Sequence, residues 1–123
     1  MSQQLQPETT YGAIVGSVLV IQRQSLGLDQ GDVANQLGVT QATWSRIEGG
    51  LTPLTVEQMA RAAEIFRLPV SEIFRRVEQA ISNLRIQGIA VQYGSPRQLI
   101  QDGLPLIAAA ALVVLVVAAL NSK

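Results

Sequence analysis

The side chains that could carry chemistry in this chain are carboxylates, hydroxyls, amides and guanidinium groups. Its 123 residues include nine acidic and nine basic side chains but neither cysteine nor histidine, and its single lysine is Lys123. Without a thiol or an imidazole, the chain has no disulfide, no zinc finger and no thiol or imidazole nucleophile or base. We therefore expect a protein that is not an enzyme and that needs no metal or cofactor.

The apolar side chains are concentrated near the C-terminal end. Apolar residues make up 48% of the chain and charged residues 15%, and the run at 104–120, LPLIAAAALVVLVVAAL, holds no polar side chain. As a helix this run would be about 26 Å long, against roughly 30 Å for the hydrocarbon core of a bilayer. The run predicts a transmembrane helix over 104–120 with a short tail at 121–123. The alternative is a packing or oligomerisation helix of a soluble protein.

The predicted transmembrane helix also predicts where in the cell the protein is located. Arg85 and Arg97 precede the run and Lys123 follows it, so the positive charge is slightly greater on the N-terminal side. Positive charge favours the cytoplasmic side of a membrane, and the larger folded part also lacks cysteine. We expect a single-pass protein of the bacterial inner membrane with its N-terminal domain in the cytoplasm.

Five segments between residues 11 and 85 have apolar side chains at helical spacing. Several of them follow a residue whose side-chain oxygen can cap the N-terminus of a helix. We therefore expect an all-α domain of five short helices over residues 11–85. The expected helix starts are Tyr11 for the first, and Asp29, Thr40, Thr55 and Ser71, as caps or first residues, for the others.

The two segments that flank the predicted helices lack the helical spacing of apolar residues. Residues 1–10 are polar and rich in glutamine, which is typical of a flexible arm. Residues 86–103 form a connector in which residues 89–93, IAVQY, have the composition of a short extended segment. This segment either pairs with its copy in a second chain, which would make the protein a homo-oligomer, or docks on its own domain.

The middle of the chain resembles a known family. The run LDQGDVANQLGVTQATWSRIEGG, from Leu28 to Gly50, is followed by LTPLTVEQMARAAEIFRLPVSEIF up to Phe74. Together these runs resemble the lambda-repressor-like helix-turn-helix family, also called the Cro-type or xenobiotic-response-element family. The resemblance covers about Val15 to Phe74, roughly half of the chain. It implies that the domain is a five-helix helix-turn-helix domain; the hydrophobic helix expected from the apolar run at 104–120 is a separate C-terminal element.

The resemblance implies roles for one helix in particular. In this family the third helix lies in the major groove of DNA and the second crosses the backbone. Transferred to this chain, a glutamine could pair with adenine, an arginine with guanine, and an alanine could contact a thymine methyl group. The implied base contacts are Gln41, Ala42 and Arg46, and the implied phosphate contacts are Gln30, Thr40, Thr43 and Ser45.

Each of these residues also has a structural interpretation. Gln41 could be a solvated residue of the first turn. Arg46 could pair with Glu48 or Asp32 instead of a base. Trp44 could stack on a base, but its position is one that the family fills with an aliphatic core residue, so we expect it in the core. Glu48 we expect to hold a backbone group or an arginine within the domain.

The charge of the domain bears on the partner. From Tyr11 to Phe74 the chain has four arginines and six acidic residues, a balance of 4 − 6 = −2, whereas DNA-binding surfaces are usually basic. The sequence predicts a membrane-tethered DNA-binding transcriptional regulator. The alternative is a membrane-anchored cytoplasmic scaffold, in which the same domain binds a protein of the cell-envelope, cytoskeletal or secretion machinery. That layout resembles a bacterial cell-shape adaptor.

Overall fold

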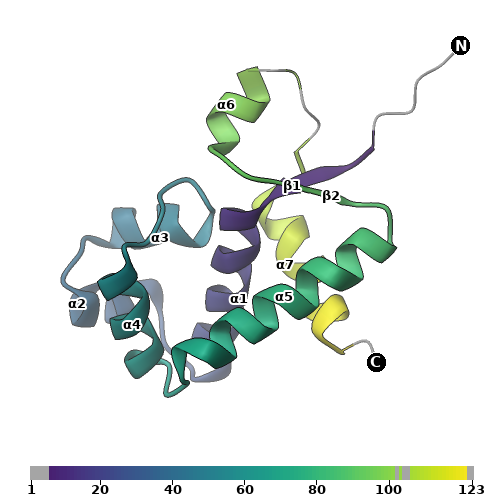
Figure 1. Cartoon of the computed structure of the whole chain (residues 1–123). Helices are drawn as coiled ribbons and strands as arrows, with labels where there is room; N and C mark the ends of the chain where they lie inside the picture. The colour runs from purple at the N-terminus through teal and green to yellow at the C-terminus, as the bar shows by residue number, and fades with distance from the viewer. Residues whose placement is uncertain (1–5, 102, 104–105, 122–123) are drawn as a thin grey trace, which may run out of the picture.

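Seven helices and two short strands make up the part of the chain that the computed structural model describes, which is residues 6–101, 103 and 106–121. Figure 1 shows α1 near the centre of the molecule, with α2, α3 and α4 on one side and α5 and α7 on the other. In chain order the elements are β1 (Glu8–Thr10), α1 (Tyr11–Ser25), α2 (Gln30–Leu37), α3 (Gln41–Glu48), α4 (Val56–Ile65), α5 (Val70–Ile86), β2 (Ala90–Gln92), α6 (Pro96–Gln101) and α7 (Ala109–Asn121).

Helices α1 to α5 lie where the sequence predicts five helices, except that α5 begins at Val70, one residue before the predicted Ser71, and has no side-chain cap. Asp29, Thr40 and Thr55 each accept a hydrogen bond from the backbone N–H three residues later, so each is the predicted N-cap. Asp29 and Thr55 complete capping boxes with Asp32 and Gln58. The caps satisfy backbone donors that would otherwise lack a partner, and they fix where each short helix begins.

The backbone of α1 is in close contact with the backbone at the end of α3. A Cβ atom on Gly16 would lie 2.2 Å from the carbonyl oxygen of Glu48, and one on Gly50 would lie 2.5 Å from the Cα of Ala13. Gly50 also has φ of +76°, which favours glycine. Only glycine fits at these two positions, so α1 and the end of α3 are held in a single close arrangement.

The two strands correct the predicted arm and limit the predicted all-α class. Strand β1 pairs in parallel with β2, with Glu8 opposite Ala90 and Thr10 opposite Gln92. Thr9 and Thr10 are buried, and the Thr10 side chain caps α1. The arm predicted over residues 1–10 therefore includes a buried strand at its end; residues 1–5 lie outside the described residues. The extended segment predicted at 89–93 contains β2, which pairs with β1 of its own chain, as the docked alternative has it; pairing of its other edge with a copy stays a prediction.

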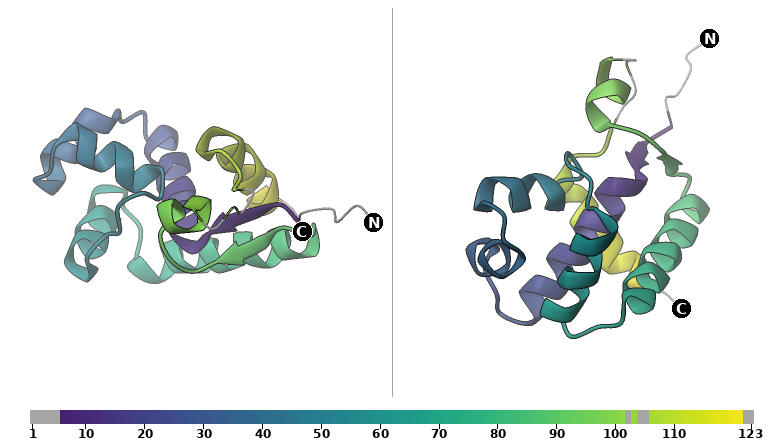
Figure 2. Two further views of the ribbon diagram at one scale, coloured as in Figure 1. Left: turned by 90° about the horizontal axis from the view of Figure 1, so that it is seen from above. Right: turned by 60° about the vertical axis from the view of Figure 1, so that its left-hand side comes forward.

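Helix α7 packs on α1 and α5, and it is not a separate hydrophobic helix. Both views of Figure 2 place α7 beside these two helices. The side chains of Leu112, Val116 and Ala119 are completely buried against them. At the end of α7, the amides of Gln79 and Asn83 on α5 donate to the carbonyl oxygens of Leu120 and Ala119. These bonds satisfy carbonyls that a helix end leaves without partners.

The prediction of a transmembrane helix over 104–120 was wrong. Helix α7 has 13 residues, which is about 20 Å of helix against roughly 30 Å of hydrocarbon. Among the described residues, no helix combines the length and the apolar character needed to cross a membrane. The predicted single-pass location in an inner membrane depended on that span and is corrected with it.

Packing of α7 in the core can be tested by paired substitutions on its two faces. Leu112 is 0% exposed and Val114 is 68% exposed. We expect Leu112→Ala to lower the free energy of unfolding by about 2–5 kcal/mol, because it leaves a cavity between α7 and its neighbours. Val114→Ala should change it by less than about 0.5 kcal/mol. Denaturant unfolding of the full chain measures both, and equal effects of the two substitutions would show that α7 is not packed as described.

The close approach of α1 and α3 gives a second stability prediction. Gly16→Ala should lower the free energy of unfolding by about 1–3 kcal/mol, since the added methyl group overlaps the backbone of Glu48. Gly12, one turn earlier in α1, is the matched control because its nearest neighbour, the Gly50 carbonyl oxygen, would be 3.7 Å from an added Cβ. Gly12→Ala should be neutral or stabilising, by up to about 1 kcal/mol. Thermal unfolding of the two variants and of the parent measures these changes; equal stability of the two variants would contradict the close approach of α1 and α3.

Candidate nucleic-acid interface

A tight turn connects α2 to α3 and sets their relative orientation. Gly38 takes the left-handed conformation, with φ of +80°, and ends α2. The backbone N–H groups of Gly38 and Val39 both donate to the carbonyl oxygen of Ala34. The next residue, Thr40, already caps α3. Since two residues separate the end of α2 from this cap, the two helices form the helix-turn-helix unit that the sequence predicts.

Helix α3 has a buried face and an exposed face. Trp44, Ile47 and Glu48 are buried, whereas the side chains on the outer face reach solvent. The outer face consists of the exposed residues Gln41, Ala42, Ser45 and Arg46, with Thr40 exposed at the start and Thr43 half-buried beside them. Helical spacing brings Gln41 next to Ser45 and Ala42 next to Arg46. Six of the seven predicted contact residues therefore lie together at the surface of α3 and its cap.

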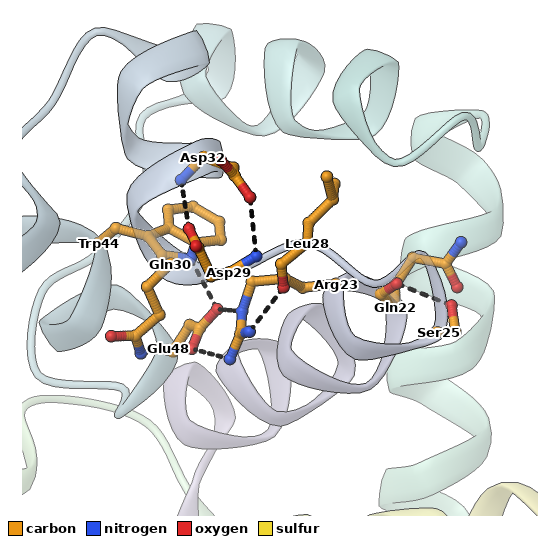
Figure 3. Close-up of polar contacts among 9 residues, drawn as sticks. All are labelled: Gln22, Arg23, Ser25, Leu28, Asp29, Gln30, Asp32, Trp44 and Glu48. Carbon is orange, nitrogen blue, oxygen red and sulfur yellow. Dashed lines mark hydrogen bonds and ion pairs between the residues drawn. The ribbon is translucent and has the colours of Figure 1, made fainter.

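The buried carboxylate of Glu48 joins three helices (Figure 3). Arg23 of α1 binds it with two hydrogen bonds, from Nε to Oε2 at 2.6 Å and from Nη2 to Oε1 at 3.0 Å. The Nε2 of Gln30 on α2 donates to Oε1 at 2.8 Å, and the indole Nε1 of Trp44 donates to Oε2 at 2.6 Å. The Glu48 and Arg23 side chains are 4% and 12% exposed. Four donors on one buried charge fix how α3 sits against α1 and α2.

The structure separates the alternatives left by the sequence. Trp44 is fully buried and its ring packs against Phe66, with centroids 6.1 Å apart, so the core interpretation is confirmed. Glu48 holds an arginine within the domain, as expected, but that arginine is Arg23. Arg46 pairs with neither Glu48 nor Asp32; its Nη2 donates to the Thr43 hydroxyl at 3.3 Å.

Gln30 is the predicted contact residue whose surroundings differ most from expectation. It is half-buried and its side-chain amide donates to Glu48. The carboxylates of Asp29 and Asp32 lie beside it in the capping box of α2. Both features make contact with a phosphate less favourable at Gln30 than at the exposed hydroxyls of α3. Its role as a phosphate contact stays a prediction.

Sequence reasoning missed Arg23 as the partner of Glu48. The two residues are 25 positions apart and lie on different helices. The one available signal was that Glu48 follows Ile47 on the apolar stripe of α3, where a charged side chain needs a partner. No group of acidic side chains in the described part of the chain could hold a metal ion.

Comparisons with known proteins agree with this geometry. Residues 15–73 match the family model described as a helix-turn-helix domain. The fold is similar to the crystal structure of the clp gene regulator ClgR from Corynebacterium glutamicum, with a TM-score of 0.61 over 77% of this chain and 95% of that one, at 15% identity. No curated protein matches the chain. Residues 15–73 are thus similar to helix-turn-helix domains, which are a non-enzymatic class, in agreement with the expectation from composition.

The contacts of Glu48 predict a large and specific loss of stability. Glu48→Ala would leave the Arg23 guanidinium buried without its counter-ion, so we expect the free energy of unfolding to fall by about 3–5 kcal/mol. Glu48→Gln keeps one acceptor and should lose less. Glu64→Ala removes an exposed carboxylate of α4 and should stay within about 0.5 kcal/mol of the parent. Denaturant unfolding compares the three; similar values for Glu48→Ala and Glu64→Ala would contradict the described network.

Proposed function

We propose that this protein is a DNA-binding transcriptional regulator that reads sequence with the outer face of α3. The observation that carries the proposal is the two-sided construction of this helix. Its inner face is locked by Glu48 to α1 and α2, while its outer face presents exposed polar side chains, one arginine and one methyl group, bonded only among themselves in the part of the chain that the structure describes. A rigid helix with such a face, on a helix-turn-helix fold, suits insertion in the major groove.

The proposed contacts divide into those that read bases and those that set position. Gln41 can pair with adenine N6 and N7, Arg46 with guanine O6 and N7, and Ala42 can contact a thymine methyl group. The hydroxyls of Thr40, Thr43 and Ser45, with Gln30 at the start of α2, are the proposed phosphate contacts. The similarity in fold to a clp gene regulator supports this assignment of a regulatory role.

The number of available cations shapes how binding should behave. Arg23 is occupied by Glu48, and Arg46 is the one basic residue of α3. A single domain would therefore neutralise few phosphates, and its affinity should depend only weakly on salt. Two copies on two half-sites about 34 Å apart would double the contacts, so we propose that the protein binds DNA as a homodimer.

The test is selection of binding sites from a randomised duplex pool by the purified full chain, followed by titration of the selected duplex. Arg46→Ala should weaken binding about 5- to 150-fold and relax specificity at one base position. Arg85→Ala is the matched control, because it removes the same charge from the exposed end of α5, far from α3 (Figure 1). It should change the dissociation constant by no more than about 3-fold.

Two results would contradict the proposal. One is the absence of any enriched sequence, and the other is equal loss of affinity in Arg46→Ala and Arg85→Ala.

The acidic balance from Tyr11 to Phe74 favours the second candidate, in which the same face of α3 binds a protein. Under that alternative, DNA selection fails while substitutions at Gln41 and Arg46 still abolish capture of a partner protein.

A further inference from the structure

A cavity of about 530 Å³ lies next to the last turn of α3, where it is lined by the inward-facing Ile47. It is partly open to solvent and is bordered by the first turns of α1, the loop from α3 to α4, and the segment that follows β2. Its volume lies within the range of small-molecule sites, roughly 300–1,000 Å³. The residues that form its floor and rim include Val15, Ile47, Met59, Leu51, Phe74 and Tyr93.

The cavity has no charged side chain among its lining residues. Apart from backbone groups, its polar surface comes from the hydroxyls of tyrosines and of Thr52 and Ser95. An ionic ligand would lose its water there without gaining a counter-ion, which costs several kcal/mol. Anions, cations and nucleotides are therefore poor occupants, and a neutral molecule that is mostly apolar is a good one.

Aromatic side chains form one wall of the cavity. The rings of Tyr11 and Tyr93 are stacked, with centroids 5.7 Å apart and planes 21° apart. The Tyr11 hydroxyl donates to Glu78, and burial, assisted by the Glu78 charge, raises the pKa of this phenol, so it stays protonated. Tyr93 is 73% exposed and Phe74 37% exposed. A planar ring in the cavity would cover these exposed aromatic surfaces and stack on them.

The loop that borders the cavity is bonded to the residue proposed to read guanine. The backbone N–H groups of Leu51 and Thr52 both donate to the carbonyl oxygen of Arg46, at 2.8 and 3.4 Å. Ile47, the next residue of α3, also lines the cavity. An occupant that contacts Leu51, Thr52 and Ile47 therefore acts on the last turn of α3, from which the Arg46 side chain extends.

We propose that this cavity binds a small, neutral, planar aromatic molecule and that its occupation alters the last turn of α3. The binding step stands on the cavity itself. The effect on DNA affinity rests in addition on the proposed function.

Two probes that share a ring system test the binding step. N-phenyl-1-naphthylamine is neutral, and 8-anilinonaphthalene-1-sulfonate has the same aromatic framework with a negative charge. Fluorescence titration of the full chain should show that the neutral probe binds at least about tenfold more tightly than the sulfonate. Equal affinities, or tighter binding of the sulfonate, would overturn the assignment of a charge-free site.

Substitutions locate the probe. Tyr93→Ala removes one aromatic wall at an exposed position and should weaken binding of the neutral probe about 3- to 10-fold. Ile86→Ala is the control, because Ile86 is another exposed apolar side chain, at the end of α5 and outside the cavity lining. It should leave the affinity unchanged. Equal affinities of the two variants would place the probe elsewhere and overturn the proposal.

Amide hydrogen exchange tests the effect on α3 without using DNA. Saturation with the neutral probe should slow exchange at the amides of Leu51 and Thr52, which are bonded to Arg46, and leave Gly88, at the far end of α5, unchanged. Unchanged exchange at Leu51 and Thr52 would overturn the coupling.

If DNA selection fails while these exchange rates respond, the proposed function falls and this inference stands. If a selected duplex exists, its dissociation constant should shift at least about 3-fold when the probe is present.

Discussion

The buried Glu48 carboxylate is the interaction on which the arrangement of the helix-turn-helix unit depends. Its two oxygens accept hydrogen bonds from Arg23, Gln30 and Trp44, which come from α1, α2 and α3. A charge removed from water is tolerated only when its hydrogen-bonding capacity is filled and a counter-ion is close. Rotation of α3 by a fraction of a turn would break several of these bonds at once. The direction in which the outer face of α3 points is therefore set from inside the domain.

Helix α1 packs on one face against α3, which carries the Glu48 carboxylate, and on another against the apolar helix α7. Its segment IVGSVLVI, at 14–21, is nearly continuous in apolar residues, which fits a helix covered on several sides. Gly16 lets α1 touch the backbone at the end of α3, and α5 and α7 pack on other faces of α1. Helix α7 covers α1 and α5 with its inner face, so Leu112, Val116 and Ala119 belong to the shared core, while Val114 and Val117 stay exposed on the outer face.

The sequence predicts well what local chemistry determines. Asp29, Thr40 and Thr55 are N-caps by virtue of their side chains alone, and five helix positions follow from them and from apolar spacing. It predicts poorly what depends on distant partners. Glu8–Thr10 is polar and reads as an arm, yet it is a strand because β2 lies 82 positions away. Helix α7 reads as a membrane span because nothing local reveals that α5 supplies Gln79 and Asn83 to its final carbonyls.

In the candidate site, too, the sequence does not reveal contacts between distant residues. The net charge counted from the sequence therefore differs from the charge that the surface of the domain presents. Composition counts Arg23 and Glu48 as surface charges of opposite sign, but they cancel each other inside the domain. On α5, Arg75 and Arg76 hold the pKa of Glu72 at about 2, so the Glu72 charge offsets part of the positive charge of these two arginines. Asp29 and Asp32 remain beside Gln30, whose amide is already bonded to Glu48. Contacts with phosphate would then fall mainly to the hydroxyls at the start of α3, and Arg46 would carry most of the attraction to a base. If the outer face of α3 binds DNA as proposed, a surface with so little positive charge must gain its specificity from shape and hydrogen bonding, and the rigidity imposed by Glu48 then matters more than the overall charge.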